Sequence, residues 1–159
     1  MASTIDPTDD ELRTQEESLI LRSFTNDDAL ALGAQLIEAG RAQKLPITVD
    51  IRRGDQQLFH AALSGTSADN DAWVERKVRL VRRVGMSSFR VGCQLRASGR
   101  SLSEAFLISE HEYAAHGGAF PVVVANVGLV GVITVSGLPQ REDHALVVRI
   151  LSDWVAAAK

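Results

Sequence analysis

The sequence is poor in cysteine, proline and aromatic residues, and neither sign of charge dominates it. Cys93 is the single cysteine among 159 residues. One cysteine permits no internal disulfide and no Cys-x-x-Cys motif, which excludes a disulfide-stapled secreted scaffold and leaves only the reactivity of Cys93 open. Aromatic residues make up 5%, and 17 Lys+Arg against 20 Asp+Glu give a net charge of -3. This balance offers no general attraction for nucleic acid, so we expect no nucleic-acid partner.

Long hydrophobic runs and targeting signals are also missing. The most apolar stretch, residues 119–135, is interrupted by Pro121, Asn126, Gly128 and Gly131. It is too short and too broken for a membrane span and reads better as two buried strands. The first seventeen residues carry six acidic side chains and one arginine, the opposite of a secretory signal. We therefore expect a cytoplasmic protein without a membrane partner.

What remains is the composition of an ordinary globular domain. With 45% hydrophobic residues, a chain of this length can bury roughly 70% of the surface that it exposes when unfolded. Residues 1–17 predict an acidic N-terminal tail, either mobile or a short helix. Residues 18–159 show no internal repeat and no linker, so they predict one domain.

Hydrophobic periodicity predicts a mixture of helices and strands. Residues 18–24 favour a strand, and Asp69 or Asn70 is the expected N-cap of the second helix. Alternating residues predict two hairpins, from strands at 47–52, 57–63, 122–125 and 129–135. Spacings of three and four predict helices at about 26–43, 69–84, 88–95 and 139–155. The predicted fold class is therefore α+β, with an antiparallel sheet.

Three motifs that suggest catalysis fail on spacing. His111 and His116 are five residues apart, whereas two histidines on one face of a metalloprotease helix are four apart. Ser136, Asp143 and His144 are the residue types of a hydrolase triad, but they lack a G-x-S-x-G turn, and adjacent helical residues point about 100° apart. No dinucleotide fingerprint is present. The sequence thus identifies no catalytic residue and no metal ligand, and an enzyme acting on a small carboxylate remains a hypothesis without an acid, base or nucleophile.

Two segments are candidates for ligand binding. The basic segment at 73–83 includes Arg76 and Lys77 and is either a solvated helix face, an anion site, or a partner of the acidic tail. The segment 134–140 leads a buried strand through Ser136 and Gly137 into a helix N-terminus, whose free N–H groups attract carboxylate or phosphate unless Ser136 simply caps the helix.

Two histidines lie near these segments. His144 sits one turn into the last helix, where a buried, hydrogen-bonded histidine is the default interpretation. His116 precedes Gly117 and Gly118, which allow close approach of a backbone or a ligand, and is the better ligand or interface candidate.

These residues resemble a known family. The motifs are Asp69-Asn-Asp-Ala-Trp-Val-Glu-Arg-Lys77, Ser87-Ser88, His116-Gly-Gly-Ala-Phe-Pro121 and Thr134-Val-Ser-Gly-Leu-Pro-Gln-Arg-Glu-Asp-His144. They look like uncharacterised protein family 0303, over roughly residues 18–155. That family is similar in turn to the broader GlcG/HbpS-like domains, which carry the label haem-degrading.

The resemblance implies a profilin- or PAS-like α+β domain with about five antiparallel strands, assembled as a homo-oligomer, either a dimer or a larger ring. It implies haem as one ligand, held noncovalently because the sequence has no Cys-x-x-Cys-His site. His116 or His144 would then be the axial ligand, and Arg76, Lys77 or Arg79 would pair with propionates.

Two functions follow as hypotheses. The first is a cytoplasmic oligomer that binds haem or a small anion through Arg76, Lys77, His116, Gly117, Gly118, Ser136, Gly137 and His144. The second is a non-catalytic assembly protein in which the histidines and basic residues stabilise subunit interfaces.

Overall fold

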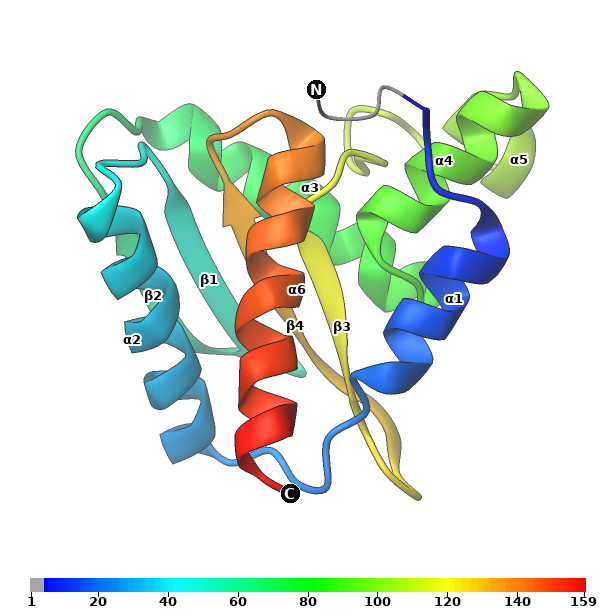
Figure 1. Ribbon diagram of the computed structural model, residues 1–159. Helices are drawn as coiled ribbons and strands as arrows, with labels where there is room; N and C mark the ends of the chain where they lie inside the picture. Colours follow the sequence, from blue (N-terminus) through cyan, green and yellow to red (C-terminus); the bar gives the residue numbers. More distant parts are fainter. Residues whose placement is uncertain (1–4) are drawn as a thin grey trace.

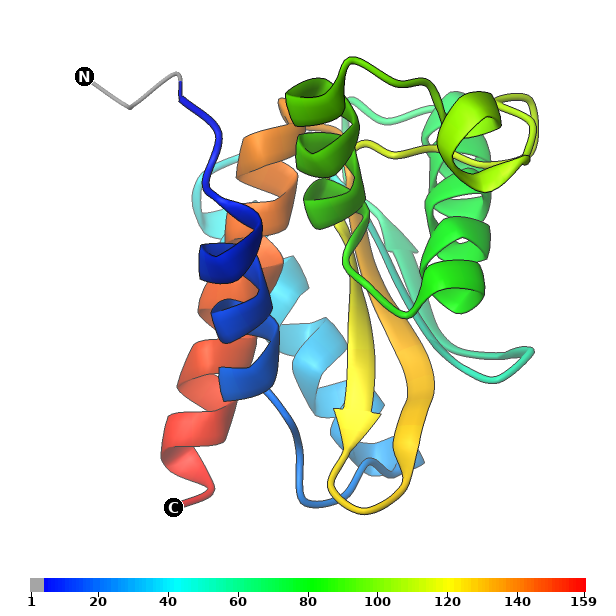
Figure 2. The ribbon, with the colours of Figure 1, turned by 90° about the vertical axis from the view of Figure 1, so that its right-hand side faces the viewer.

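The computed structural model describes residues 5–159 and arranges them in three layers. Helices α2 and α6 cover one face of a sheet, and α3 covers the other, with α4 and α5 beside it (Figures 1 and 2). The elements are α1 (Asp9–Ser18), α2 (Asn26–Ala42), β1 (Thr48–Arg53), β2 (Gln56–Ala62), α3 (Ala68–Val84), α4 (Ser88–Ser98), α5 (Leu102–Phe106), β3 (Ala119–Val124), β4 (Gly128–Ser136) and α6 (Gln140–Ala157).

The sheet is built from the two predicted hairpins. The strand order is β2-β1-β4-β3, and every neighbouring pair is antiparallel. Strand β1 alternates as its sequence predicts, with Val49 and Ile51 packed in the main core between the sheet and α2 and α6. Its other face carries Thr48 and Asp50, which are fully buried beneath α3. Burial on both faces explains why the central strands contain so few exposed residues.

The apolar stretch at 119–135 forms β3 and β4, as expected. Phe120, Val122 and Ile133 join the main core, and Ala119 and Val132 pack against α3. Among residues 5–159, no helix is long and apolar enough to cross a membrane.

The sheet has four strands rather than about five in the described part of the chain. Residues 18–24, expected to form a strand, contribute one isolated parallel bridge between Leu21 and Val124. The Leu21 N–H donates to the Val123 carbonyl, and the Ala125 N–H donates to the Leu21 carbonyl. A single bridge forms here because Leu21 lies in a short connection between α1 and α2, too short to run along β3.

Helix starts follow the expected chemistry with one correction. Thr25 caps α2 in a capping box with Asp28. Neither Asp69 nor Asn70 is the N-cap of α3. Ser67 is the N-cap, and the Asn70 side-chain oxygen accepts a hydrogen bond from the Ser67 N–H at 2.9 Å. The helix therefore begins two residues earlier than an N-cap at Asp69 would place it.

Residues 5–18 lie against the domain. Within the segment expected as an acidic tail, α1 is a helix whose Leu12 packs on Phe89 and Cys93. Residues 1–4 of that segment lie outside the described residues.

Candidate functional site

A pocket of about 240 Å³ opens where the last residues of β4 meet the start of α6 and the first half of α3. Four of the predicted residues line it: Lys77, His116, Ser136 and Gly137. Its other lining residues are Asp69, Asn70, Trp73, Leu138, Gln140 and Asp143. The fold thus brings together three segments that are more than 15 residues apart in sequence, as the candidate site requires.

Lys77 links the two helical layers at this end of the sheet. It lies on the apolar stripe of α3 with Val74, Val78 and Val81, and its side chain is 3% exposed. Its Nζ donates to the carbonyls of Gly117 at 2.8 Å and Val135 at 3.2 Å, and lies 3.4 Å from an Asp143 carboxylate oxygen. Burial lowers the pKa of Lys77, and the charge of Asp143 opposes that shift.

Asp143 closes the turn between β4 and α6. Its carboxylate accepts hydrogen bonds from the backbone N–H groups of Gly137 and Leu138, at 3.3 and 2.9 Å. Ser136 therefore does not cap α6, and Pro139, at the N-cap position, makes no side-chain cap. Burial raises the pKa of Asp143 to about 6, despite the nearby Lys77 charge and the two N–H donors.

His116 stands between this pocket and a second one of the same volume, about 240 Å³. It keeps an exposed face, and its ring meets Trp73 edge to face, with centroids 5.0 Å apart. Partial burial lowers the pKa of His116, and the positive charges of Lys77 and Arg76 lower it further. The imidazole is therefore neutral at pH 7. The second pocket is lined on its polar side by Arg76, Arg96, Arg100, Ser101, Glu110 and Tyr113.

Arg76 turns away from the first pocket. Its guanidinium lies over the Trp73 ring, 4.7 Å from the centroid, and donates to the Glu110 carbonyl. It thereby fixes the wall that Trp73 and His116 share, while its charge faces the second pocket.

Gly117 and Gly118 lie where the backbone passes close to α6 and to Lys77. A Cβ on Gly117 would lie 2.2 Å from the Gln140 carbonyl oxygen, and Gly118 has a φ of +134° with Lys77 Nζ only 2.7 Å from the place of a Cβ. The Gly117 N–H also donates to the Gln140 side-chain oxygen at 3.0 Å. These glycines let the chain before β3 approach α6 and leave room for the Lys77 amine.

His144 lies apart from both pockets, packed under α1. Its ring stacks on Phe89 at 4.7 Å, and its Nε2 is 2.7 Å from the Gln15 side-chain oxygen. Because that oxygen only accepts, Nε2 carries the proton and the buried Nδ1 is left without a partner among the described residues. Burial, followed by the Arg141 charge, lowers the pKa of His144 to about 4.

Sequence reasoning missed Asn70, Trp73, Gln140 and Asp143 as parts of the site. Two signals were available. Lys77 occupies an apolar-stripe position of its helix, which predicts a buried amine that needs an acidic partner. Asp143 lies four residues after Pro139, where a carboxylate can reach back to the free N–H groups of a helix start.

Sequence comparison finds close relatives along nearly the whole chain. Residues 24–152 match the model of the family described as haem degrading protein HbpS-like. A UPF0303 protein of Streptomyces coelicolor is 54% identical over 149 residues, 94% of each chain. A UPF0303 protein of Paraburkholderia phytofirmans is 43% identical over 140 residues, 88% of this chain and 85% of its own.

Solved structures show the same fold. The Ybr137w protein superposes with a TM-score of 0.91 at 31% identity, covering 98% of this chain and 91% of its own. A PduOC:heme complex gives 0.65 at 12% identity, covering 84% and 94%, and HbpS gives 0.56 at 14%, covering 97% and 93%. The last two likenesses, at low identity, concern the fold alone.

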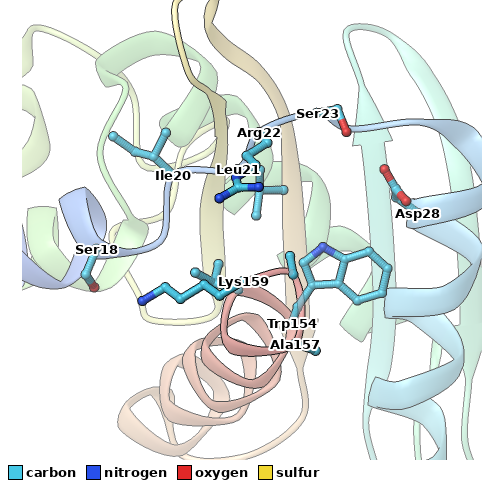
Figure 3. Close-up of a pocket in the computed structure, with 11 residues that line it drawn as sticks. Ser18, Ile20, Leu21, Arg22, Ser23, Asp28, Trp154, Ala157 and Lys159 are labelled. Carbon is cyan, nitrogen blue, oxygen red and sulfur yellow. The ribbon is translucent and has the colours of Figure 1, made fainter.

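Another pocket, of about 530 Å³, lies between the end of α6 and the connection from α1 to α2 (Figure 3). It combines the Trp154 indole and Ile20 with the cationic side chains of Arg22 and Lys159. None of the predicted residues lines it, and every lining residue except Asp28 falls outside the matched range of 24–152. The pocket beside His116 lies wholly inside that range, which makes it the stronger candidate.

Proposed function

The chain belongs to the HbpS-like family and, within it, to the UPF0303 proteins, and from this premise we propose that it binds a small organic anion at the pockets beside His116. One observation carries the proposal. The second pocket beside His116 is lined by three cationic side chains, Arg76, Arg96 and Arg100, against one anionic side chain, Glu110.

This local excess of positive charge stands out in a chain whose net charge is -3. In the first pocket, a carboxylate would meet the Asn70 amide and the His116 imidazole, while Lys77 lies beside the acids Asp69 and Asp143 that line the same pocket. Helix α3 and the segments just before β3 and just after β4 hold these groups in place. Binding therefore needs little reordering of side chains.

Haem is the group that the family description implies. The donor chemistry suits it in part: His116 is a neutral imidazole with an exposed face, and Arg76, Arg96 and Arg100 lie on one side of it. The space does not suit it. Pockets that enclose drug-sized ligands measure about 300–1,000 Å³, and each pocket beside His116 has about 240 Å³. Neither encloses a porphyrin, and His144 is covered by α1.

Calorimetric titration with lactate and with inorganic phosphate tests this function, beside a haemin titration followed by its absorption band. We expect saturable binding of one small anion per chain. In His116→Ala, we expect binding about tenfold weaker, because one hydrogen bond of about 1.4 kcal/mol is lost. His111→Ala, an exposed histidine outside both pockets, is the matched control.

Equal affinity in wild type and His116→Ala, or no saturable binding of either anion, would contradict the small-anion site. If haemin gives a saturable absorption band at one haem per chain, and the band is lost in His116→Ala, the ligand of this site is haem rather than a small anion.

The alternative function, an assembly protein, is favoured by a different observation. Apolar side chains are exposed around the Leu21–Val124 bridge: Ile20 is 41% exposed, Val127 70% and Leu129 40%. We propose that this end of the sheet contacts further copies of the chain in a homo-oligomer. The elution volume and light scattering of the purified protein test the oligomeric state directly.

A further inference from the structure

Lys77 is a buried amine, and two of its three hydrogen-bond partners are neutral backbone carbonyls. Its two shortest polar contacts are the carbonyl oxygens of Gly117 and Val135, at 2.8 and 3.2 Å. Two acceptors satisfy both hydrogens of a neutral amine. The nitrogen therefore keeps its place in the fold after its third proton has left.

A proton acceptor lies beside it. The Asp143 carboxylate oxygen is 3.4 Å from Nζ, and Asp143 is itself 2% exposed. Burial lowers the pKa of Lys77 and raises that of Asp143 to about 6, so both shifts favour moving the proton from nitrogen to oxygen. The pair can hold that proton as an ion pair or as a neutral amine beside a carboxylic acid.

Both groups line the same small pocket. Its volume of about 240 Å³ suits a molecule of a few heavy atoms, and its walls are Trp73, His116, Ser136 and Gln140. The lack of a side chain at Gly118 lets the backbone pack closely against the amine, since a Cβ there would lie 2.7 Å from Nζ. An amine, an acid and the neutral polar side chains of Asn70, His116 and Gln140 therefore converge on one space.

We propose that Lys77 forms an imine with a small 2-oxo acid held in this pocket, with Asp143 as the proton donor. The proposal rests on the anion site proposed above, because the ligand's carboxylate would take the position beside His116 and Asn70. It adds a reacting group, the ligand's carbonyl carbon, facing Lys77.

The chemistry balances without any further reagent. The lone pair of the neutral Nζ attacks the carbonyl carbon, and a proton passes from nitrogen to oxygen to give a carbinolamine. Asp143 then protonates the hydroxyl group, which leaves as water while the nitrogen lone pair forms the C=N bond. The products are an iminium cation on Lys77, one water molecule and the Asp143 carboxylate, whose negative charge stabilises the iminium.

Reductive trapping tests the proposal on the intact wild-type protein. Glyoxylate and pyruvate are the probes, cyanoborohydride reduces the iminium to a stable secondary amine, and peptide mass spectrometry locates the label. The chain has three lysines, so Lys44 and Lys159 act as internal references. At pH 7, we expect Lys77 to be labelled roughly tenfold faster than Lys44 for each unit by which its pKa is lowered.

Competition and one variant sharpen the test. Lactate, which has the carboxylate but no carbonyl, should slow the labelling of Lys77 and leave that of Lys44 unchanged. Asp143→Asn should slow the labelling of Lys77, because the amide supplies no proton. Labelling of Lys77 no faster than that of Lys44 would overturn the proposal.

The two proposals fail separately. If lactate binds but Lys77 is not labelled fast, the anion site is supported and the imine proposal is contradicted. If Lys77 is labelled fast and lactate does not slow the labelling, the reactive amine is supported and the anion site beside it is contradicted.

Discussion

At the scale of single residues, His144 carries a consequence for stability at acid pH. Its pKa is about 4 in the fold against 6.5 for the free side chain. Between these values, the unfolded chain binds a proton that the folded chain does not, so His144 makes stability fall as the pH drops from about 6.5 to 4. The expected loss is roughly 3 kcal/mol.

Urea unfolding of wild type and His144→Gln at pH 7.0 and 4.5 measures this effect. We expect the wild type to lose more stability than the variant between the two values. Asp143 titrates in the opposite direction, because its pKa is raised from 3.8 to about 6. The difference between the two proteins removes that contribution. His111→Gln, at an exposed histidine, should behave like wild type.

Asp143 itself stabilises three groups at once. Asp143→Asn leaves the Lys77 amine without its acidic partner and removes one of the acceptors of the Gly137 and Leu138 N–H groups. Removing the charge of one partner of a buried ion pair lowers the free energy of unfolding by about 3–5 kcal/mol. We expect a loss of about 3 kcal/mol here, because the Asn amide oxygen still accepts one of the two backbone hydrogen bonds. Chemical denaturation at pH 7 checks this. Asp153→Asn, on the exposed side of α6, should change stability by less than about 0.5 kcal/mol.

At the scale of elements, α1 is held chiefly by charge. Arg90 of α4 pairs with Asp9 and Glu16, both at 2.7 Å, and Asp6 pairs with Arg96 at 2.7 Å. The helix buries one side chain, Leu12. Arg90→Ala should therefore free α1 locally, at a cost of about 2 kcal/mol, while the sheet stays folded.

Hydrogen exchange resolves this prediction by segment. In Arg90→Ala, the amides of α1 should exchange faster and those of β4 should not. Arg13→Ala is the control, because Arg13 pairs only with residues of α1 itself. Equal acceleration in α1 and β4 would mean that α1 is part of the cooperative fold rather than a separately held helix.

The sequence predicted the hairpins and long helices because each depends on local periodicity and caps. Strand β1 alternates, and α2 begins at a threonine followed three residues later by an acid. The site was predicted only in part, because its geometry depends on contacts between distant segments. Nothing local to Asp143 shows that Lys77 of α3 will reach it, and nothing local to residues 18–24 shows that only Leu21 will pair.

His116 was ranked above His144 as a ligand from its glycine neighbours. The structure gives a different reason for the same preference. His116 faces pockets because the chain before β3 crosses the end of the sheet, whereas His144 is covered by Gln15 of α1. The covering helix lies in the acidic segment, for which the sequence offered the basic residues 73–83 as one possible partner. The ion pairs that hold it are instead made by Arg90 and Arg96.

At the scale of the whole molecule, the proposed ligand site and the proposed contact between copies of the chain lie on different surfaces. The pocket beside His116 is lined by residues of one chain, and the exposed apolar residues Val127 and Leu129 belong to the turn between β3 and β4 and to the start of β4. Figure 2 shows this turn at the opposite end of the hairpin from the start of α6. We therefore expect Val127→Lys to reduce the oligomer to smaller species, since a charge placed in an apolar interface costs several kcal/mol. Light scattering after size exclusion measures the change in mass.

The same variant separates the two functions. If anion binding belongs to the pocket, Val127→Lys binds lactate as tightly as wild type after its mass has fallen. If the basic residues and histidines act only at subunit contacts, binding and assembly are lost together. Leu107→Lys is the matched control, because Leu107 is 87% exposed and lies after α5, away from the hairpin. An unchanged mass in Val127→Lys would place the contact between copies elsewhere on the surface.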